Sequence, residues 1–233
     1  MITITEDGII EPFGIILSRE TRQQLLPPTR DISEEKEAAD GDIDFGTELK
    51  AGELILHGII EFEPEDKYSA KTTLAGQLKD CIDPQQLVFE VNPDMSIFVR
   101  LSGKPEIVEY ASWIEVTIPF KTEPFWVSPD ENTLTGSGTL TNAGTFETPL
   151  TIEIAGPVTN PSVVVGSETL SYTGTIESGQ TLTINTEYQT AKIGSTNATS
   201  GYNGVYPLLQ PGSTNVTAVV AGTTLFRWRN RWI

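Results

Sequence analysis

The sequence has very few of the side chains on which metal and nucleophile chemistry usually depends. Cys81 is the only cysteine and His57 the only histidine among 233 residues. A disulfide and a sulfur-based metal site are therefore excluded, and any catalytic triad would have to use His57. Because His57 lies in an apolar stretch between Leu56 and Gly58, and no serine stands in a nucleophile-elbow motif, we interpret it as a structural histidine.

Positive charge and long apolar runs are also scarce. The chain has 15 basic and 32 acidic residues, a net charge of −17. Residues 1–128 carry 25 acids and 11 bases, net −14, whereas residues 129–233 carry 7 and 4, net −3. This acidity argues against nucleic-acid binding, because phosphates would be repelled. The N-terminus lacks the features of a secretory signal, and no run approaches the roughly 18 apolar residues that span a bilayer. We therefore expect a soluble protein made in the cytosol, without membrane insertion.

Residues 113–138 mark a change of character along the chain. Alternating apolar residues predict a strand with one buried face, formed by Ile114, Val116, Ile118 and Phe120. Prolines, Asn132 and glycines then interrupt regular structure between residues 124 and 138. We predict two domains, residues 1–128 and residues 129–233, with an acidic first and a Thr- and Gly-rich second domain.

The first domain is predicted to be rich in β-structure with one helix. Apolar runs predict strands near residues 2–4, 9–17, 54–62, 87–91, 97–101 and 108–110. Between them, Ala70, Leu74, Leu78 and Ile82 recur every four residues, which predicts an amphipathic helix over residues 69–83. Ser69 or Thr72 is its expected N-cap, Asp83-Pro84 its end, and a hairpin turn is expected at residues 92–94.

An acidic segment separates the first strands from the rest of this domain. Residues 31–48 hold eight acids and one base, Lys36, without a sustained hydrophobic period, so we interpret residues 19–53 as a long exposed loop. Such loops are usually functional or ordered by a partner. The stretch from Asp40 begins like a calcium-binding loop, but Phe45 and Ala51 occupy the places that need glycine and glutamate. We therefore predict no metal site.

The second domain is predicted to be an all-β sandwich. Apolar residues alternate at 150, 152 and 154 and at 182 and 184, and Gly, Asn and Pro punctuate the chain about every ten residues. Near the C-terminus, residues 226, 228, 230 and 232 are expected on one face of a strand and Arg227, Arg229 and Arg231 on the other. These three cations call for an anionic partner, for which the acidic loop is the nearest candidate. The alternative is an edge strand protected by charge.

Two further functions remain open from composition alone. A glycan hydrolase needs two carboxylates about 5 to 10 Å apart, and nothing in the sequence selects a pair among Glu61, Glu63, Glu147, Glu153 and Glu177. A carbohydrate-binding module would use exposed aromatics. Each of the candidate aromatics could either stack on sugar rings or fill a core. The candidates are Tyr172, Tyr188, Tyr202, Tyr206, Trp228 and Trp232.

Taken in order, several motifs resemble the distal tail proteins of long-tailed, siphovirus-type bacteriophages. They are IIEPFGIIL, DIDFGTEL, LHGIIEF, IEVTIPFKTEPFW, GTLTNAGTFETPLTIEIAG, YPLLQPGSTNVTAVV and LFRWRNRWI. The resemblance implies an N-terminal domain that forms a hexameric ring and a C-terminal galectin-like β-sandwich. The second domain is short, however, and no obvious long arm for gripping a receptor-binding protein is inserted.

The resemblance also implies a structural role without catalytic residues, metals or cofactors. The ring would join the tail tube protein to the tail-tip hub protein, carry host-adhesion components and let DNA pass through its lumen. The protein would be made in the host cytoplasm and reside in the virion tail tip. We expect interface residues at Asp31, Glu34, Glu35, Asp40, Asp42, Asp44, Arg227, Arg229 and Arg231.

Overall fold

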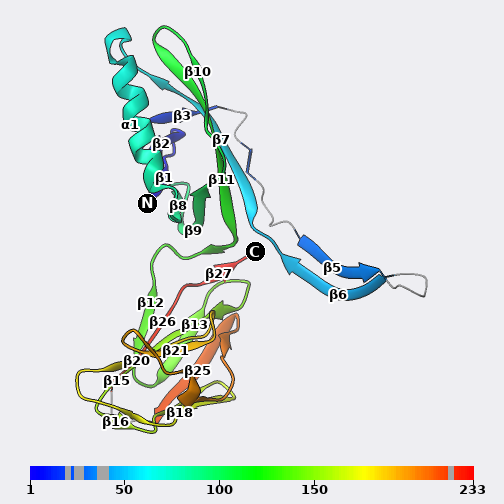
Figure 1. Cartoon of the computed structure of the whole chain (residues 1–233), viewed down its shortest axis with the longest axis vertical. Helices are drawn as coiled ribbons and strands as arrows, with labels where there is room; N and C mark the ends of the chain where they lie inside the picture. The colour runs from blue at the N-terminus through cyan, green and yellow to red at the C-terminus, as the bar shows by residue number, and fades with distance from the viewer. Residues whose placement is uncertain (19–21, 24–28, 36–41, 220–222) are drawn as a thin grey trace. The chain divides into compact units, whose positions relative to one another are not determined.

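The computed structural model of the chain describes residues 1–18, 22–23, 29–35, 42–219 and 223–233, with the backbone alone at 22–23, 29–35, 42–48 and 219 (Figure 1). The chain divides into two compact units. The first comprises Met1–Pro129 with Ile233, and the second comprises Asp130–Trp232. The boundary between them lies one residue after the one expected from the sequence, and each unit has its own hydrophobic core.

The first unit is built on a closed barrel of seven strands. Its strands follow the order β11-β9-β8-β1-β2-β3-β7, and β7 pairs back with β11 to close the ring of strands. Their bounds are β1 Ile2–Ile4, β2 Ile9–Glu11, β3 Ile15–Leu17, β7 Gly52–Glu61, β8 Gln85–Phe89, β9 Asn92–Leu101 and β11 Trp113–Val127. Two short strands flank the barrel, β4 Arg22–Gln23 beside β7 and β10 Glu106–Glu109 beside β11.

Strand β11 confirms the alternation expected from the sequence. Ile114, Val116, Ile118 and Phe120 are all at most 1 % exposed and line the barrel core. The strand does not end near Pro124 as expected but continues to Val127. A shift in its register with β9 accommodates this proline, since a bulge is one of the few places within a sheet where proline fits.

The single α-helix of the described chain, α1 (Lys67–Asp80), follows a short 3-10 turn at Pro64–Asp66. Leu74 and Leu78 join the barrel core, as the four-residue period predicted. Ile82 is 65 % exposed because the helix ends two residues before it. The expected N-caps are wrong: Asp66 occupies the N-cap position and its side chain makes no capping hydrogen bond.

The predicted hairpin between β8 and β9 exists, but its turn lies earlier than expected. Phe89 is already paired with Asn92, so the chain reverses at residues 90 and 91. Asn92, Pro93 and Asp94, which the sequence placed in the turn, form the start of β9 instead.

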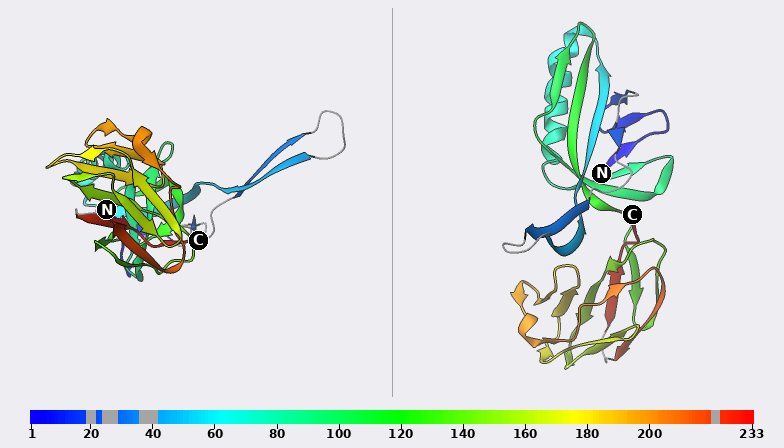
Figure 2. Two further views of the ribbon diagram at one scale, coloured as in Figure 1. Left: turned by 90° about the horizontal axis from the view of Figure 1, so that it is seen from below. Right: turned by 90° about the vertical axis from the view of Figure 1, so that its right-hand side faces the viewer.

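The acidic segment is not a loop throughout. Strands β5 (Thr29–Glu35) and β6 (Asp42–Leu49) pair antiparallel and form a two-stranded sheet of their own (Figure 2). The expectation of an irregular loop is therefore wrong for these residues. Isolated β-prone residues such as Ile32, Ile43 and Phe45 lie among the acids, and backbone pairing needs no continuous apolar face. Lys36 and Asp40 lie outside the described residues.

The second unit is a β-sandwich, as predicted. A six-stranded sheet in the order β12-β26-β15-β20-β21-β22 shares one core with a five-stranded sheet in the order β13-β25-β17-β18-β23. The strands of the first sheet are β12 Asn132–Thr135, β15 Thr151–Ala155, β20 Thr181–Asn185, β21 Thr190–Ile193, β22 Thr196–Asn197 and β26 Thr224–Trp228. Those of the second are β13 Gly138–Asn142, β17 Ser162–Val165, β18 Glu168–Tyr172, β23 Tyr202–Asn203 and β25 Gly212–Val219.

Short elements complete this unit. They are the pairs β14 (Thr148–Pro149) with β24 (Leu208–Leu209) and β16 (Val158–Thr159) with β19 (Thr175–Ile176), the 3-10 turn Thr199–Gly201, and β27 (Arg231–Trp232). The alternating apolar residues of β15, β20 and β26 fill the core, and Ile152, Ile184 and Phe226 are completely buried. Period-two alternation therefore gave the buried face of these strands correctly.

Candidate assembly surfaces

The β5–β6 hairpin carries most of the acidic residues predicted at an interface. Asp31, Glu34 and Glu35 lie on β5, and Asp42 and Asp44 lie on β6. The backbone register places Glu35 opposite Asp42 and Ser33 opposite Asp44. Two carboxylates directly opposite each other repel, and an isolated two-stranded sheet is marginal in water. A hairpin of this composition therefore favours a cationic partner.

The C-terminal arginines have carboxylate partners within the second unit. Arg227 Nη1 donates to Glu131 Oε2 at 3.1 Å, and Arg227 Nε lies 3.3 Å from Glu153 Oε1. The hydrogen bonds that Arg227 donates to Glu131 and, through Nη2, to Glu153 Oε2 raise the pKa of Arg227 above its ordinary value. Arg231 Nη2 donates to Glu187 Oε1 at 2.7 Å.

The alternating face expected for residues 226–232 holds only for part of its length. Strand β26 ends at Trp228, and both Phe226 and Trp228 are buried. Arg229 follows the end of this strand, and Arg231 belongs to β27. A role of these arginines at an interface stays a prediction.

A hydrogen-bonded line of serine, histidine and glutamate lies on the outer side of the barrel wall. Ser18 Oγ is 2.7 Å from His57 Nδ1, and His57 Nε2 is 2.9 Å from Glu115 Oε1. The backbone adds a bond, since Ser18 N–H donates to His57 O. Sequence reasoning missed this cluster because its members are far apart along the chain. The contacts tie the segment after β3 to β7 and β11, which agrees with a structural histidine.

A lysine pair fastens α1 to the edge strand β10. Lys67 Nζ lies 2.9 Å from Glu109 Oε2, and Lys71 Nζ contacts Glu109 Oε1. The hydrogen bonds from Lys71 and Lys67 lower the pKa of Glu109 to about 2. The sequence held a faint signal for this contact, the four-residue spacing of the lysines along one face of a helix.

The aromatic residues considered for sugar stacking are mostly packed against one another or the core. Trp228 is 8 % exposed, and its Nε1–H donates to Thr141 O. Tyr202 and Tyr206 stack with ring centroids 4.2 Å apart, and burial raises the pKa of both hydroxyls. Tyr188, in contrast, is 73 % exposed. Tyr202 and Tyr206 also pack against the core of the second unit.

The described residues contain no group of three or more His, Cys, Asp or Glu side chains placed to hold a metal ion. Among the same residues, no helix is long and apolar enough to cross a bilayer.

Two family models match the chain, one within each unit. The model described as "Phage tail protein RIFT-related domain" matches residues 10–122, and that described as "Siphovirus-type tail component, C-terminal domain" matches residues 143–232. A comparison with curated proteins finds no match.

A solved structure shares the fold of the whole chain. The crystal structure of the Dit protein (gp 19.1) of phage SPP1 matches over 100 % of both chains, with a TM-score of 0.70 and 16 % identity. A chain of the phage P2 baseplate in its activated conformation with Ca matches with a TM-score of 0.48 and 8 % identity over 90 % of this chain and 89 % of that one.

Proposed function

Because this chain belongs to the siphovirus-type phage tail component family, we propose that it is a structural protein of the tail tip that assembles into a hexameric ring. The observation that carries this proposal is the order of the two family matches, since one falls in each compact unit. The SPP1 protein with the same fold is described as a paradigm of the hub adsorption apparatus in phages that infect Gram-positive bacteria. We assign the present chain a comparable position, between the tail tube protein and the tail-tip hub protein, as a carrier of adhesion components such as a receptor-binding protein.

The first unit would drive ring formation, with the β5–β6 hairpin at the contact between subunits. The hairpin pairs with no other sheet among the described residues, and it places Glu35 opposite Asp42. Both features favour its docking on a neighbouring molecule.

The ring would leave a lumen through which the genome passes. A wall lined by cations would retain phosphates, because each neutralised phosphate releases counterions and adds affinity. Residues 1–128 carry a net charge of −14 and would instead form a wall that repels phosphates. We expect part of residues 31–48 or 61–66 to contribute to it and Arg227, Arg229 and Arg231 to lie away from it. A cryo-electron-microscopy map of the assembled ring would contradict this if Lys and Arg lined most of the bore.

The second unit would serve as a mounting platform for adhesion components. The sandwich fold is shared by many sugar-binding proteins, but a fold does not by itself confer that function. With Trp228 in the core and Tyr172, Tyr202 and Tyr206 packed against it, at most two of the six candidate aromatics are available for sugar rings.

The solution mass of the purified full chain tests the proposal. We expect light scattering to give six times the chain mass of 25.4 kDa at micromolar concentration. Negative-stain images of the same sample should show rings with a central opening. A monomer at all concentrations and salt conditions would contradict ring formation by this chain alone.

A further inference from the structure

Two cations face each other across adjacent strands of the barrel. Arg100 on β9 and Lys121 on β11 are direct cross-strand partners, and both are exposed. Like charges in this arrangement are destabilising. Neither side chain has an ion pair among the described residues, although Lys121 also lies opposite Glu53 of β7 in the register. The register thus sets Lys121 between one like and one opposite charge, and it gives Arg100 no facing carboxylate among the described residues.

This pair borders a cavity that the irregularity in β11 creates. The register moves from Thr122 opposite Val99 to Trp126 opposite Ile97, so three residues of β11 lie against Phe98 alone. The widened gap leaves a cavity of about 350 Å³. Its lining includes Ala51, Phe98, Arg100, Lys121, Glu123 and Pro124. Apolar carbon lies beside two cations and one carboxylate, Glu123, and this lining of net positive charge suits a segment that combines acidic with hydrophobic residues.

Most other clustered cations already have partners. Lys67 and Lys71 contact Glu109, while Arg227 and Arg231 contact carboxylates of the second unit. The Arg100–Lys121 pair thus stands out in a part of the chain whose net charge is −14.

We propose that this cavity receives the β5–β6 hairpin of a second copy of the chain, with hairpin carboxylates on Arg100 and Lys121. The inference rests on the proposed ring and identifies the surface that accepts the hairpin. The two strands combine isolated apolar residues with a single base, Arg30, and six acids: Asp31, Glu34, Glu35, Asp42, Asp44 and Glu48. Their charge is complementary to that of the pair.

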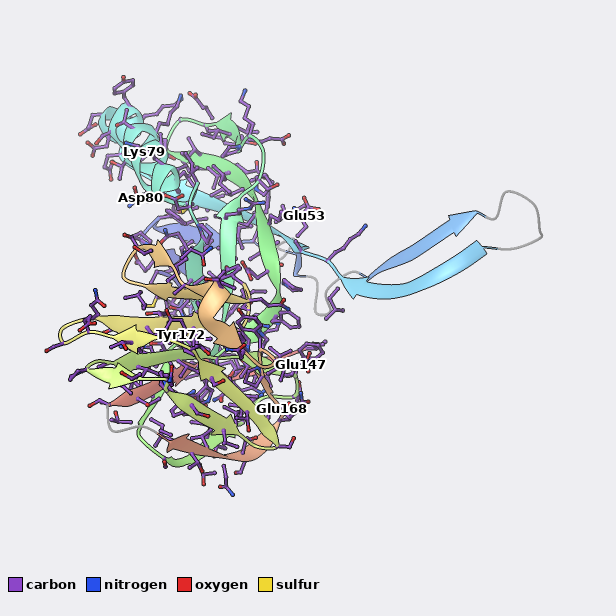
Figure 3. The ribbon with its side chains drawn as sticks, turned by 60° about the horizontal axis from the view of Figure 1, so that its bottom comes forward. Glu53, Lys79, Asp80, Glu147, Glu168 and Tyr172 are labelled. Carbon is purple, nitrogen blue, oxygen red and sulfur yellow. The ribbon has the colours of Figure 1, made fainter. Side chains whose placement is uncertain are left out.

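The position of the cavity favours a second copy over the chain's own hairpin. Ala51 lines the cavity, and β6 ends at Leu49, so the hairpin departs from the cavity itself. Glu53, at the start of β7, marks this place in Figure 3. To reach the cavity of its own molecule, the hairpin would have to reverse within the two residues between β6 and β7. Since β6 spans about 26 Å at about 3.3 Å per residue, its acidic residues extend toward a neighbour instead.

Reversing the charges on each side of the proposed contact, in the full chain, tests it. One variant, R100E/K121E, reverses the cavity pair, and another, E35K/D42K, reverses two opposed hairpin residues. Each variant alone should dissociate from hexamer to monomer in 0.15 M salt, with the dissociation constant of assembly at least about tenfold higher. Mixing the two should restore the hexamer, because in an alternating ring every hairpin again meets a cavity of opposite charge. The control is K79E/K104E, which makes the same charge change at exposed lysines outside the cavity.

The outcomes separate this inference from the proposed ring. A wild-type chain that remains monomeric contradicts the ring itself. A wild-type hexamer that either reversed variant also forms unchanged overturns the docking site but leaves the ring intact. The docking site is also overturned if the mixture of the two variants fails to reassemble. If a chain that carries all four substitutions then forms the hexamer although the mixture does not, the contact lies within a single molecule. Restoration on mixing cannot come from variants that have merely unfolded.

Discussion

At the scale of single residues, Gly58 shows how little room the closed barrel leaves between β3 and β7. A Cβ atom at this position would lie 2.4 Å from Ile16 O and 2.6 Å from Ile15 Cγ2. We expect Gly58→Ala to destabilise the first unit by about 1–3 kcal/mol, because backbone must move to admit the methyl group. Urea unfolding followed by circular dichroism measures this.

The control for that substitution lies on α1. A methyl group added at Gly76 would meet no neighbouring atom within 4 Å, so Gly76→Ala should stabilise the same unit by about 1 kcal/mol through helix propensity. Equal effects of the two substitutions would contradict the crowding argument.

The ion pairs of Glu109 should make the stability of the first unit depend on pH. Its pKa is lowered from 4.5 to about 2, so its ion pairs with Lys67 and Lys71 contribute stability above pH 4.5 and lose it as the pH falls through 2. Since these groups are exposed, Glu109→Gln should lower Tm by only about 1–3 °C at pH 7, and the difference from wild type should vanish below pH 2. Glu106→Gln on the same strand should leave Tm unchanged, and a pH-independent Tm difference for Glu109→Gln would count against this account.

At the scale of elements, the strands with regular alternation were predictable and the irregular ones were not. Period two in β11, β15 and β20 identified their buried residues, because one face of each strand packs into a core. The bulge after Thr122 was not predictable, since it depends on how β9 accommodates Pro124. The β5–β6 hairpin was missed for a different reason: its strands are held by backbone pairing and carry no apolar period.

For the candidate assembly surfaces too, some features were predictable from the sequence and others were not. The acidic composition of the hairpin and the three C-terminal arginines were visible in the sequence. The partners of Arg227 and Arg231, the pairing of Arg100 with Lys121, and the Ser18–His57–Glu115 line were not, because each requires a register between distant strands. Sequence patterns report local faces, whereas these contacts are set by the closure of the sheets.

At the scale of the whole molecule, two separate cores predict that the units can be separated. A fragment of residues 129–233 should fold as a monomer, because its core forms entirely within Asp130–Trp232. Residues 1–128 should still oligomerise, since the hairpin and the Arg100–Lys121 cavity both belong to that part. Sedimentation of the two fragments gives the answer, and an oligomer formed by the C-terminal fragment alone would show that ring formation is assigned to the wrong unit.

The second unit is expected to bind sugar weakly, if at all. Four of its six candidate aromatics, Tyr172, Tyr202, Tyr206 and Trp228, lie in the core or pack against it, whereas Tyr188 is exposed. Screening residues 129–233 on a glycan array should therefore give no binding tighter than micromolar. A sub-micromolar signal for a bacterial saccharide would favour a carbohydrate-binding role instead, and loss of that signal in Tyr188→Ala would locate it.

Strands β3 and β7 pair directly, so the β5–β6 hairpin is an insertion in the connection between two neighbouring strands. Ile16 lies opposite Ile59 and Leu17 opposite Gly58. Ser18 is hydrogen-bonded to His57 where the insertion begins. The entropy of closing such a connection changes only slowly with its length. Replacing residues 22–49 by a short glycine-containing turn should thus leave the barrel folded, with the Tm of the first unit within about 5 °C of wild type, while abolishing assembly. The length and sequence of this insert can diverge without selection on the barrel, so the chain can acquire a new neighbour without acquiring a new fold.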